Sequence, residues 1–166
     1  MPGKKWTTVL SLFGVKDVSE HREIMMAIDS GLDVDLADSG GRTMLMEAVI
    51  QKDSTLLEAL IERGADVNRR DNRQWTALHF AAQNNDLTTG LKLMLAGADV
   101  NASDDCGNNV LLRAVFESRK DLQLVRELIE RGANPAEKNI KGISARDLAV
   151  RFGDPELCKE LGNTKN

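Results

Sequence analysis

The feature that most constrains this fold is a short sequence that recurs at a fixed spacing along the chain. Residues 64–68 read GADVN, and the same five letters return at residues 97–101, 33 residues later. A related sequence begins at Gly31, again 33 residues earlier, and a fourth begins at Gly132, 35 residues after Gly97. Self-similarity at such a period is the signature of stacked repeat units. We therefore expect a repeat protein in which each unit packs on its neighbours.

A second motif recurs at the same period. Thr43, Thr76 and Asn109 each stand two residues before a leucine and five residues before an alanine, and a fifth copy begins at Ser144. A threonine or asparagine ahead of a helix can accept a hydrogen bond from a free N–H group of its first turn. These sequences therefore predict the beginning of one helix in each unit.

A further helix in each unit is predicted to end at a glycine. Apolar residues at helical spacing lead up to Gly64, Gly97 and Gly132. Glycine just beyond a helix adopts the left-handed conformation without a Cβ penalty. Each unit is thus predicted to contain two short helices joined by a turn.

These motifs resemble the ankyrin repeat. Residues 76–81 read TALHFA, which matches the family sequence Thr-Pro-Leu-His-x-Ala except at the proline. In the family this sequence is followed later in the repeat by Gly-Ala-Asp-Val-Asn, which matches GADVN here. The resemblance covers about residues 16–161 and implies an all-α solenoid of about five helix-turn-helix units joined by β-hairpin-like loops. One domain spans residues 1–166, with degenerate terminal units. The expected units are residues 6–37, 38–70, 71–103, 104–138 and 139–161, with a tail at 162–166.

Two departures from the family pattern predict local differences. Gln74 stands where Gly41, Gly107 and Gly142 occupy the loops of other units, so we expect a strained or rearranged turn there. The fourth unit carries two extra residues near 117–121, which we expect in the turn between its helices.

Composition narrows the environment and the partners. The net charge of −4 lacks the positive field that non-specific nucleic-acid binding needs. Cys106 and Cys158 are too few for a disulfide framework, so we expect a reduced, cytoplasmic setting. No stretch approaches the ~20 apolar residues of a membrane span. Residues 1–15 form either a first capping helix or a weak export signal.

The chain offers few groups for catalysis or metal binding. His79 is the histidine of the ankyrin motif and is expected to bond neighbouring loop groups, while His21 is expected to be solvated or to cap a helix. Asp104, Asp105 and Asn108 lack the alternation of a calcium loop, and the two acids disfavour a Cys106 thiolate. We therefore expect no enzyme activity, metal, cofactor or small-molecule substrate.

The resemblance implies that a partner protein is contacted by the hairpin tips and by the end of the first of the two helices in each unit. Trp75 and Phe116 are the candidate hot spots, although Trp75 could instead pack on an adjacent hairpin. The candidate contact residues are Ser39, Arg42, Arg69, Arg70, Asn72, Arg73, Trp75, Gln83, Asn84, Asp104, Asp105, Asn108, Phe116 and Glu117.

The expected function is a non-catalytic interaction module that binds and blocks a partner protein, which could be an enzyme or a toxin. By analogy with other uses of the fold, the hypothesis is an immunity protein that neutralises a cognate bacterial toxin. The alternatives are a general adaptor or scaffold, or a nucleic-acid-binding protein that uses Arg69, Arg70 and Arg73.

Overall fold

The computed structural model describes residues 21–118 and 121–162 of the chain, and in these ranges helices follow one another in pairs. Each pair consists of an inner helix and the outer helix that packs on it, and inner helices of successive pairs contact one another. The pairs are α3 (Met44–Gln51) with α4 (Ser54–Glu62), α5 (Ala77–Gln83) with α6 (Leu87–Leu95), α7 (Val110–Glu117) with α8 (Gln123–Glu130), and α9 (Ala145–Phe152) with α10 (Pro155–Gly162); α2 (His21–Asp29) precedes them.

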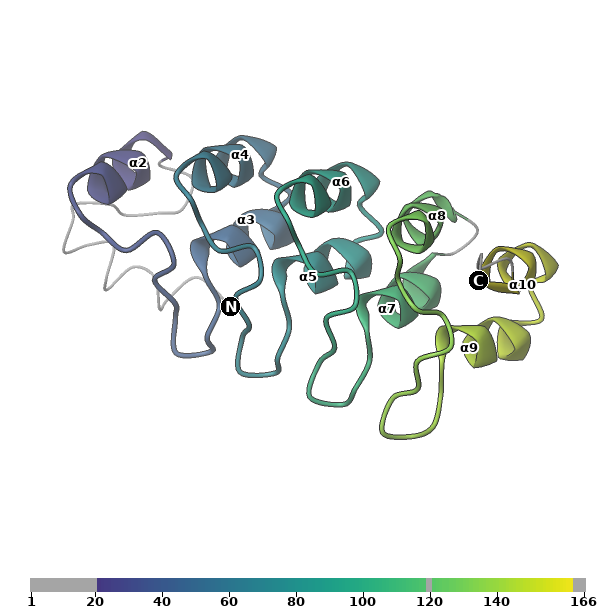
Figure 1. Cartoon of the computed structure of the whole chain (residues 1–166). Helices are drawn as coiled ribbons and strands as arrows, with labels where there is room; N and C mark the ends of the chain where they lie inside the picture. Colours follow the sequence, from purple (N-terminus) through teal and green to yellow (C-terminus); the bar gives the residue numbers. More distant parts are fainter. Residues whose placement is uncertain (1–20, 119–120, 163–166) are drawn as a thin grey trace.

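The helices form two rows, and the loops between pairs project from one side (Figure 1). The outer row holds α2, α4, α6, α8 and α10, and the inner row holds α3, α5, α7 and α9. This arrangement is the repeat solenoid that the sequence predicts. The helix expected within residues 6–15 lies outside the described residues, and Gly162 ends α10 instead of opening the tail.

The predicted helix boundaries are confirmed at both ends. The Thr43 hydroxyl accepts a hydrogen bond from the Met46 N–H at 3.3 Å, and Asn109 Oδ1 accepts one from the Leu112 N–H at 2.8 Å. Gly64 and its equivalents have φ angles of 81°, 92° and 91° at residues 64, 97 and 132. Side-chain caps therefore begin the inner helices, and left-handed glycines follow the outer ones.

A side-chain oxygen shapes each loop at the start of a unit. Asp71 Oδ1 accepts hydrogen bonds from the N–H groups of Arg73 and Trp75 at 2.8 and 2.9 Å. Asp38, Asp104 and Asn139 make the same pair of bonds to the residues two and four positions later. Such local bonds offer the backbone a turn in place of a helix. Asp104, expected at a partner contact, is thus engaged in holding its own loop.

Hydrogen bonds also join the loops of neighbouring units into one stack. The Asn72 N–H donates to the Gly40 carbonyl at 2.9 Å, and the Asp105 N–H donates to the Arg73 carbonyl at 3.1 Å. Asn68 connects its own turn to the equivalent turn of the next unit. Its side chain donates to the Gly97 carbonyl at 3.0 Å and accepts from the Asp99 N–H at 2.8 Å. The loops are therefore fixed relative to one another.

The turn at Gln74 is strained but not rearranged. Gln74 has a φ angle of 63°, close to the 77° of Gly41 and the 73° of Gly107. Its N–H donates to the Asp71 carbonyl at 2.8 Å, as the Gly41 N–H donates to Asp38 at 2.9 Å. The neighbouring loops impose the geometry, so a residue with a Cβ is held in the left-handed region.

The longer connection of the fourth unit lies where the sequence places it. Residues 118–122 join α7 to α8, whereas residues 84–86 join α5 to α6. The two extra residues therefore fall in the turn between the helices, and positions 119–120 themselves are outside the described ranges.

Candidate protein-interaction surface

The candidate contact residues belong to the loops and to the ends of the inner helices. We call the surface formed by the loop tips and the exposed side chains of the inner helices the inner-helix face. Exposed members are Ser39, Arg69, Arg70, Asn72, Arg73, Gln83, Asp105 and Phe116, and half-buried members are Arg42, Asn84, Asp104, Asn108 and Glu117. Trp75 is the one candidate that the structure places in the core.

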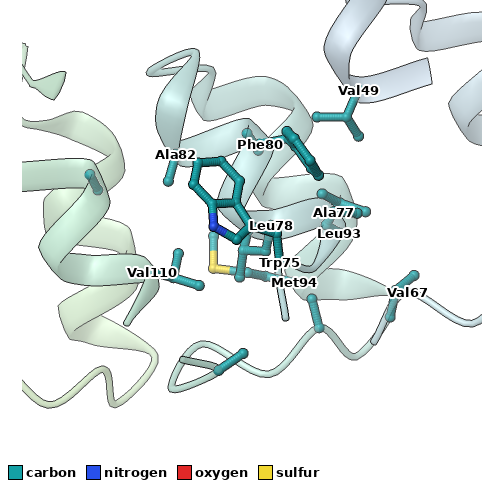
Figure 2. Close-up of a cluster of buried hydrophobic side chains, with 14 of the residues drawn as sticks. Val49, Val67, Trp75, Ala77, Leu78, Phe80, Ala82, Leu93, Met94 and Val110 are labelled. Atoms are coloured by element: carbon teal, nitrogen blue, oxygen red, sulfur yellow. The ribbon is translucent and has the colours of Figure 1, made fainter. Parts of the chain in front are cut away.

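Trp75 does not meet the expectation of a direct contact residue. It is only 4% exposed and lies within the cluster of buried hydrophobic side chains drawn in Figure 2. Its ring centroid is 5.0 Å from that of Phe80 and 5.8 Å from that of His79. The prediction was wrong because loop position alone does not show which way a side chain points, and this one packs on α5. Trp75 therefore packs within the stack, and its ring contacts are with α5 of its own unit, whereas the alternative named an adjacent hairpin.

Two arginines cover the buried indole ring. The guanidinium carbon of Arg73 lies 4.5 Å from the Trp75 ring centroid, and that of Arg113 lies 4.7 Å from it. The interaction of a cation with the face of an aromatic ring favours both contacts. Arg113 was missed by sequence reasoning, which considered only the ends of the inner helices. The available signal was its position one helical turn before Glu117, at the same place in its unit as Phe80.

The other arginines of this region are divided among different contacts. Arg70 Nη1 donates to the Ser103 carbonyl of the next unit at 2.8 Å. Arg69 lies 4.0 Å from the Asp35 carboxylate of the preceding unit. Two of the three arginines considered for nucleic-acid binding, Arg69 and Arg70, therefore make contacts between units.

An aromatic pair lies at the far end of the same face. The rings of Phe116 on α7 and Phe152 on α9 are 6.4 Å apart between centroids and inclined at 48°. Phe116 is 57% exposed and Phe152 is 50% exposed. Phe152 was missed because it lies in the fifth unit, which was expected to be a degenerate terminal unit. The signal was its register, since it ends an inner helix as Glu117 does.

His79 is held by hydrogen bonds at both ring nitrogens. Nδ1 accepts from the Thr76 backbone N–H at 3.1 Å, and Nε2 lies 3.4 Å from the Asn108 carbonyl oxygen. These partners place the proton on Nε2. Burial lowers the pKa of His79 to about 4, so the ring is neutral near pH 7. This environment agrees with the expected structural role.

His21 was expected to be solvated or to cap a helix, and its side chain instead contacts a residue of the next unit. Its Nε2 lies 2.5 Å from Asp53 Oδ2, and both side chains are partly buried. Because Asp53 also caps α4 by accepting from the Leu56 N–H at 3.0 Å, the contact joins α2 to the next outer helix.

An acidic loop tip gathers the atoms that could approach a metal ion. Ligand atoms of Asp104, Asp105 and Cys106 lie within 4.8 Å of one another. The Asp104 carboxylate already accepts from the Cys106 N–H and from both the backbone and side-chain N–H groups of Asn108. Asp105, through a hydrogen bond and its charge, raises the pKa of the Cys106 thiol, which disfavours the thiolate ligand.

Comparison with known families decides the class of this fold. The family model described as "Ankyrin repeats (3 copies)" matches residues 18–104 and again residues 78–166. The chain belongs to the ankyrin-repeat family. Ankyrin repeats are generally non-catalytic modules of protein–protein interaction, and the expected fold is thereby confirmed.

A relative from Treponema pallidum (strain Nichols) also carries ankyrin repeats. It is named "Putative ankyrin repeat-containing protein" and is 43% identical to this ankyrin chain over 56 residues. That match spans 34% of the chain and 18% of the relative. Within the described part of the ankyrin chain, moreover, no helix combines the length and apolar character that crossing a bilayer requires.

Proposed function

We propose that this ankyrin-repeat protein binds a partner protein through its inner-helix face and blocks it. The observation that carries the proposal is the exposed Phe116–Phe152 pair on that face. Exposed aromatic side chains gain most when a partner covers them, and aromatic residues and arginine dominate interface energetics. Arg73 and Arg113 lie on the same face.

Blocking a partner requires affinity and a fixed shape, with no reacting group. The loops of this face are joined to one another by backbone hydrogen bonds, so little ordering is needed when a partner binds. An immunity protein that neutralises a bacterial toxin would work by such occlusion. The bacterial ankyrin relative is compatible with that setting.

The adaptor and nucleic-acid hypotheses differ from this proposal in what they predict. An adaptor would bind its partner without lowering the partner's activity. A nucleic-acid-binding protein would need Arg69 and Arg70 free for phosphates, whereas Arg70 is hydrogen-bonded to Ser103 and Arg69 lies near Asp35. No single observation favours either alternative.

The test is affinity purification of the tagged full chain from its native source, followed by mass spectrometry and an activity assay of the recovered partner. Phe116→Ser removes part of the aromatic pair. Leu95→Ser is the matched control, because Leu95 is 76% exposed at the end of the outer helix α6. We expect one stoichiometric protein partner with the wild type and the control, and its loss with Phe116→Ser.

The activity assay then separates blocking from scaffolding. We expect the purified partner to lose activity when the wild-type chain is added, and co-expression to protect cells if the partner is toxic. Recovery of nucleic acid alone, or of the same partner with Phe116→Ser, would contradict binding through this face. A partner with unchanged activity would contradict blocking.

A further inference from the structure

We infer that Arg73 and Arg113 form a carboxylate-binding site and that, with Phe116 and Phe152, they select a partner segment carrying an acidic side chain close to a large apolar one. The inference rests on the proposed function and specifies the chemistry of its partner. The starting point is the pair of guanidinium groups over the Trp75 ring.

Both guanidinium groups have hydrogen-bonding capacity left for a partner. A guanidinium carries five N–H donors and no acceptor. The closest carboxylate oxygens are 3.9 Å away in each case, Asp71 Oδ2 for Arg73 and Glu117 Oε1 for Arg113. These distances exceed a hydrogen bond. Across the described ranges, neither guanidinium has a hydrogen-bond partner.

The nearby acids are not arranged to satisfy these donors. Asp71 is buried, and its Oδ1 accepts from the N–H groups of Arg73 and Trp75, which fixes the carboxylate within the loop. Glu117 lies one helical turn from Arg113 at the end of α7. The Asp71 and Glu117 carboxylates therefore stabilise the positive charge of the two arginines, while the guanidinium N–H groups stay available to a partner.

The Trp75 ring orders the two side chains before a partner arrives. Since each guanidinium carbon is within 5 Å of one ring centroid, the two carbons are no more than about 9 Å apart. Stacking on an aromatic face holds the planar group in place and reduces the entropy lost on binding. The planar fork of a guanidinium matches the geometry of a carboxylate.

An apolar contact lies within one helical turn of this site. Arg113 and Phe116 are three residues apart on α7, so they share a face and lie about 4.5 Å apart along the helix axis. Phe152 extends the apolar area toward α9. An extended peptide rises about 3.3 Å per residue. An acidic and an apolar side chain within about three residues of each other would therefore reach both contacts.

A nucleic acid fits this surface less well than such a peptide. Asp105 is exposed on the adjoining loop, and Glu117 is 3.9 Å from Arg113. A continuous chain of phosphates would approach both carboxylates, whereas a single acidic side chain can avoid them. Phe116 and Phe152 also favour an apolar side chain over a sugar–phosphate backbone.

The test uses a phage-displayed library of random 12-residue peptides, selected on the immobilised full chain. Selected peptides are then synthesised with a fluorescent label, and their binding is measured by anisotropy. We expect Asp or Glu to be enriched within about three residues of Leu, Ile, Phe or Trp. Arg73→Gln/Arg113→Gln should weaken binding by about tenfold or more, as loss of charge-assisted hydrogen bonds does.

Matched variants separate recognition from folding and from net charge. Arg22→Gln/Arg131→Gln removes the same charge from α2 and from the end of α8, which belong to the outer row and not to the inner-helix face, and should change affinity by less than about threefold. Arg73→Lys/Arg113→Lys keeps the charge but loses the planar fork, and should bind with intermediate affinity. Circular dichroism checks that each variant is folded, and the lysine variant carries the test if the glutamine variant is not.

Several outcomes would overturn the inference. These are the absence of selected peptides, selected peptides without acidic residues, equal binding by the charge-loss and control variants, or tight binding of a labelled single-stranded oligonucleotide. A native partner that is lost with Phe116→Ser but unaffected by changes at Arg73 and Arg113 would refute this inference while leaving the proposed function intact.

Discussion

At the scale of single residues, Gln74 shows how neighbouring units dictate a backbone conformation. Other units place glycine at this turn position, and their φ angles match that of Gln74. A Cβ at Gly41 would lie 2.9 Å from the backbone nitrogen of Asn72 in the next loop. The position therefore combines a left-handed φ angle with a close approach of backbone, and both favour glycine.

Replacing Gln74 should stabilise the protein. Gln74→Gly removes the penalty of a side chain in the left-handed region, so we expect the free energy of unfolding to rise by about 1 kcal/mol. Urea denaturation followed by circular dichroism measures the change. Gln74→Ala keeps the Cβ and should show no comparable gain, and Gly41→Ala should be destabilising. An unchanged midpoint for Gln74→Gly would mean that the turn stores no strain.

At the scale of elements, His79 connects the start of α5 to the loop that precedes α7. Its ring bonds Thr76 on one side and faces the Asn108 carbonyl on the other. Burial lowers its pKa, and the positive charges of Arg70 and Arg113 act in the same direction, while the Asn108 carbonyl and Asp104 partly oppose them. Protonation of this residue would therefore weaken the junction between two units.

The stability contributed by neutral His79 should depend on pH. The unfolded chain binds a proton near pH 6.5, but the folded chain does so only near pH 4. This contribution is complete above pH 6.5 and is lost as pH falls from 6.5 to 4, by up to about 3 kcal/mol. Urea titrations at several pH values measure the free energy of unfolding. Between pH 6.5 and 4 this free energy should fall less for His79→Gln than for the wild type.

The remaining histidine provides the control for this experiment. His21→Gln should retain the pH dependence that His79 produces, because His21 contacts a different element through Asp53. Identical curves for the wild type and His79→Gln between pH 6.5 and 4 would contradict a buried neutral histidine.

At the scale of the whole molecule, stability should be distributed along the stack. Each inner helix contacts the inner helices beside it, and each outer helix packs on its own inner helix. Ion pairs join the outer row at several points, including Arg63 with Asp29 and Arg126 with Glu160. Because such contacts link neighbours only, stability approximates a sum of unit and interface terms.

Core truncations at different positions should therefore have different consequences. Leu93→Ala in α6 and Leu157→Ala in α10 each remove a fully buried side chain and should cost about 2–5 kcal/mol. We expect Leu93→Ala to speed hydrogen exchange through the central helices. Leu157→Ala should speed exchange in α9 and α10 while leaving α3–α6 protected. Uniform loss of protection with Leu157→Ala would indicate a single cooperative unit.

The sequence by itself determined the repeat, its period and the boundaries of most described helices. Those features depend on local requirements, because Thr43 caps a helix and Gly64 ends one wherever they occur in the chain. The position of the extra residues at the α7–α8 turn followed from counting along the same period. The expectation of strain at Gln74 was local too, and its φ angle agrees with it.

Tertiary structure alone decided which side chains of the predicted surface reach the solvent. Trp75 and Arg73 are two residues apart in one loop, yet the indole is buried and the guanidinium lies over it. The convergence of Arg73 with Arg113, and of Phe116 with Phe152, requires residues from different units to be placed side by side. Packing between units sets those directions, since a periodic sequence fixes where each helix begins but not what the next unit covers.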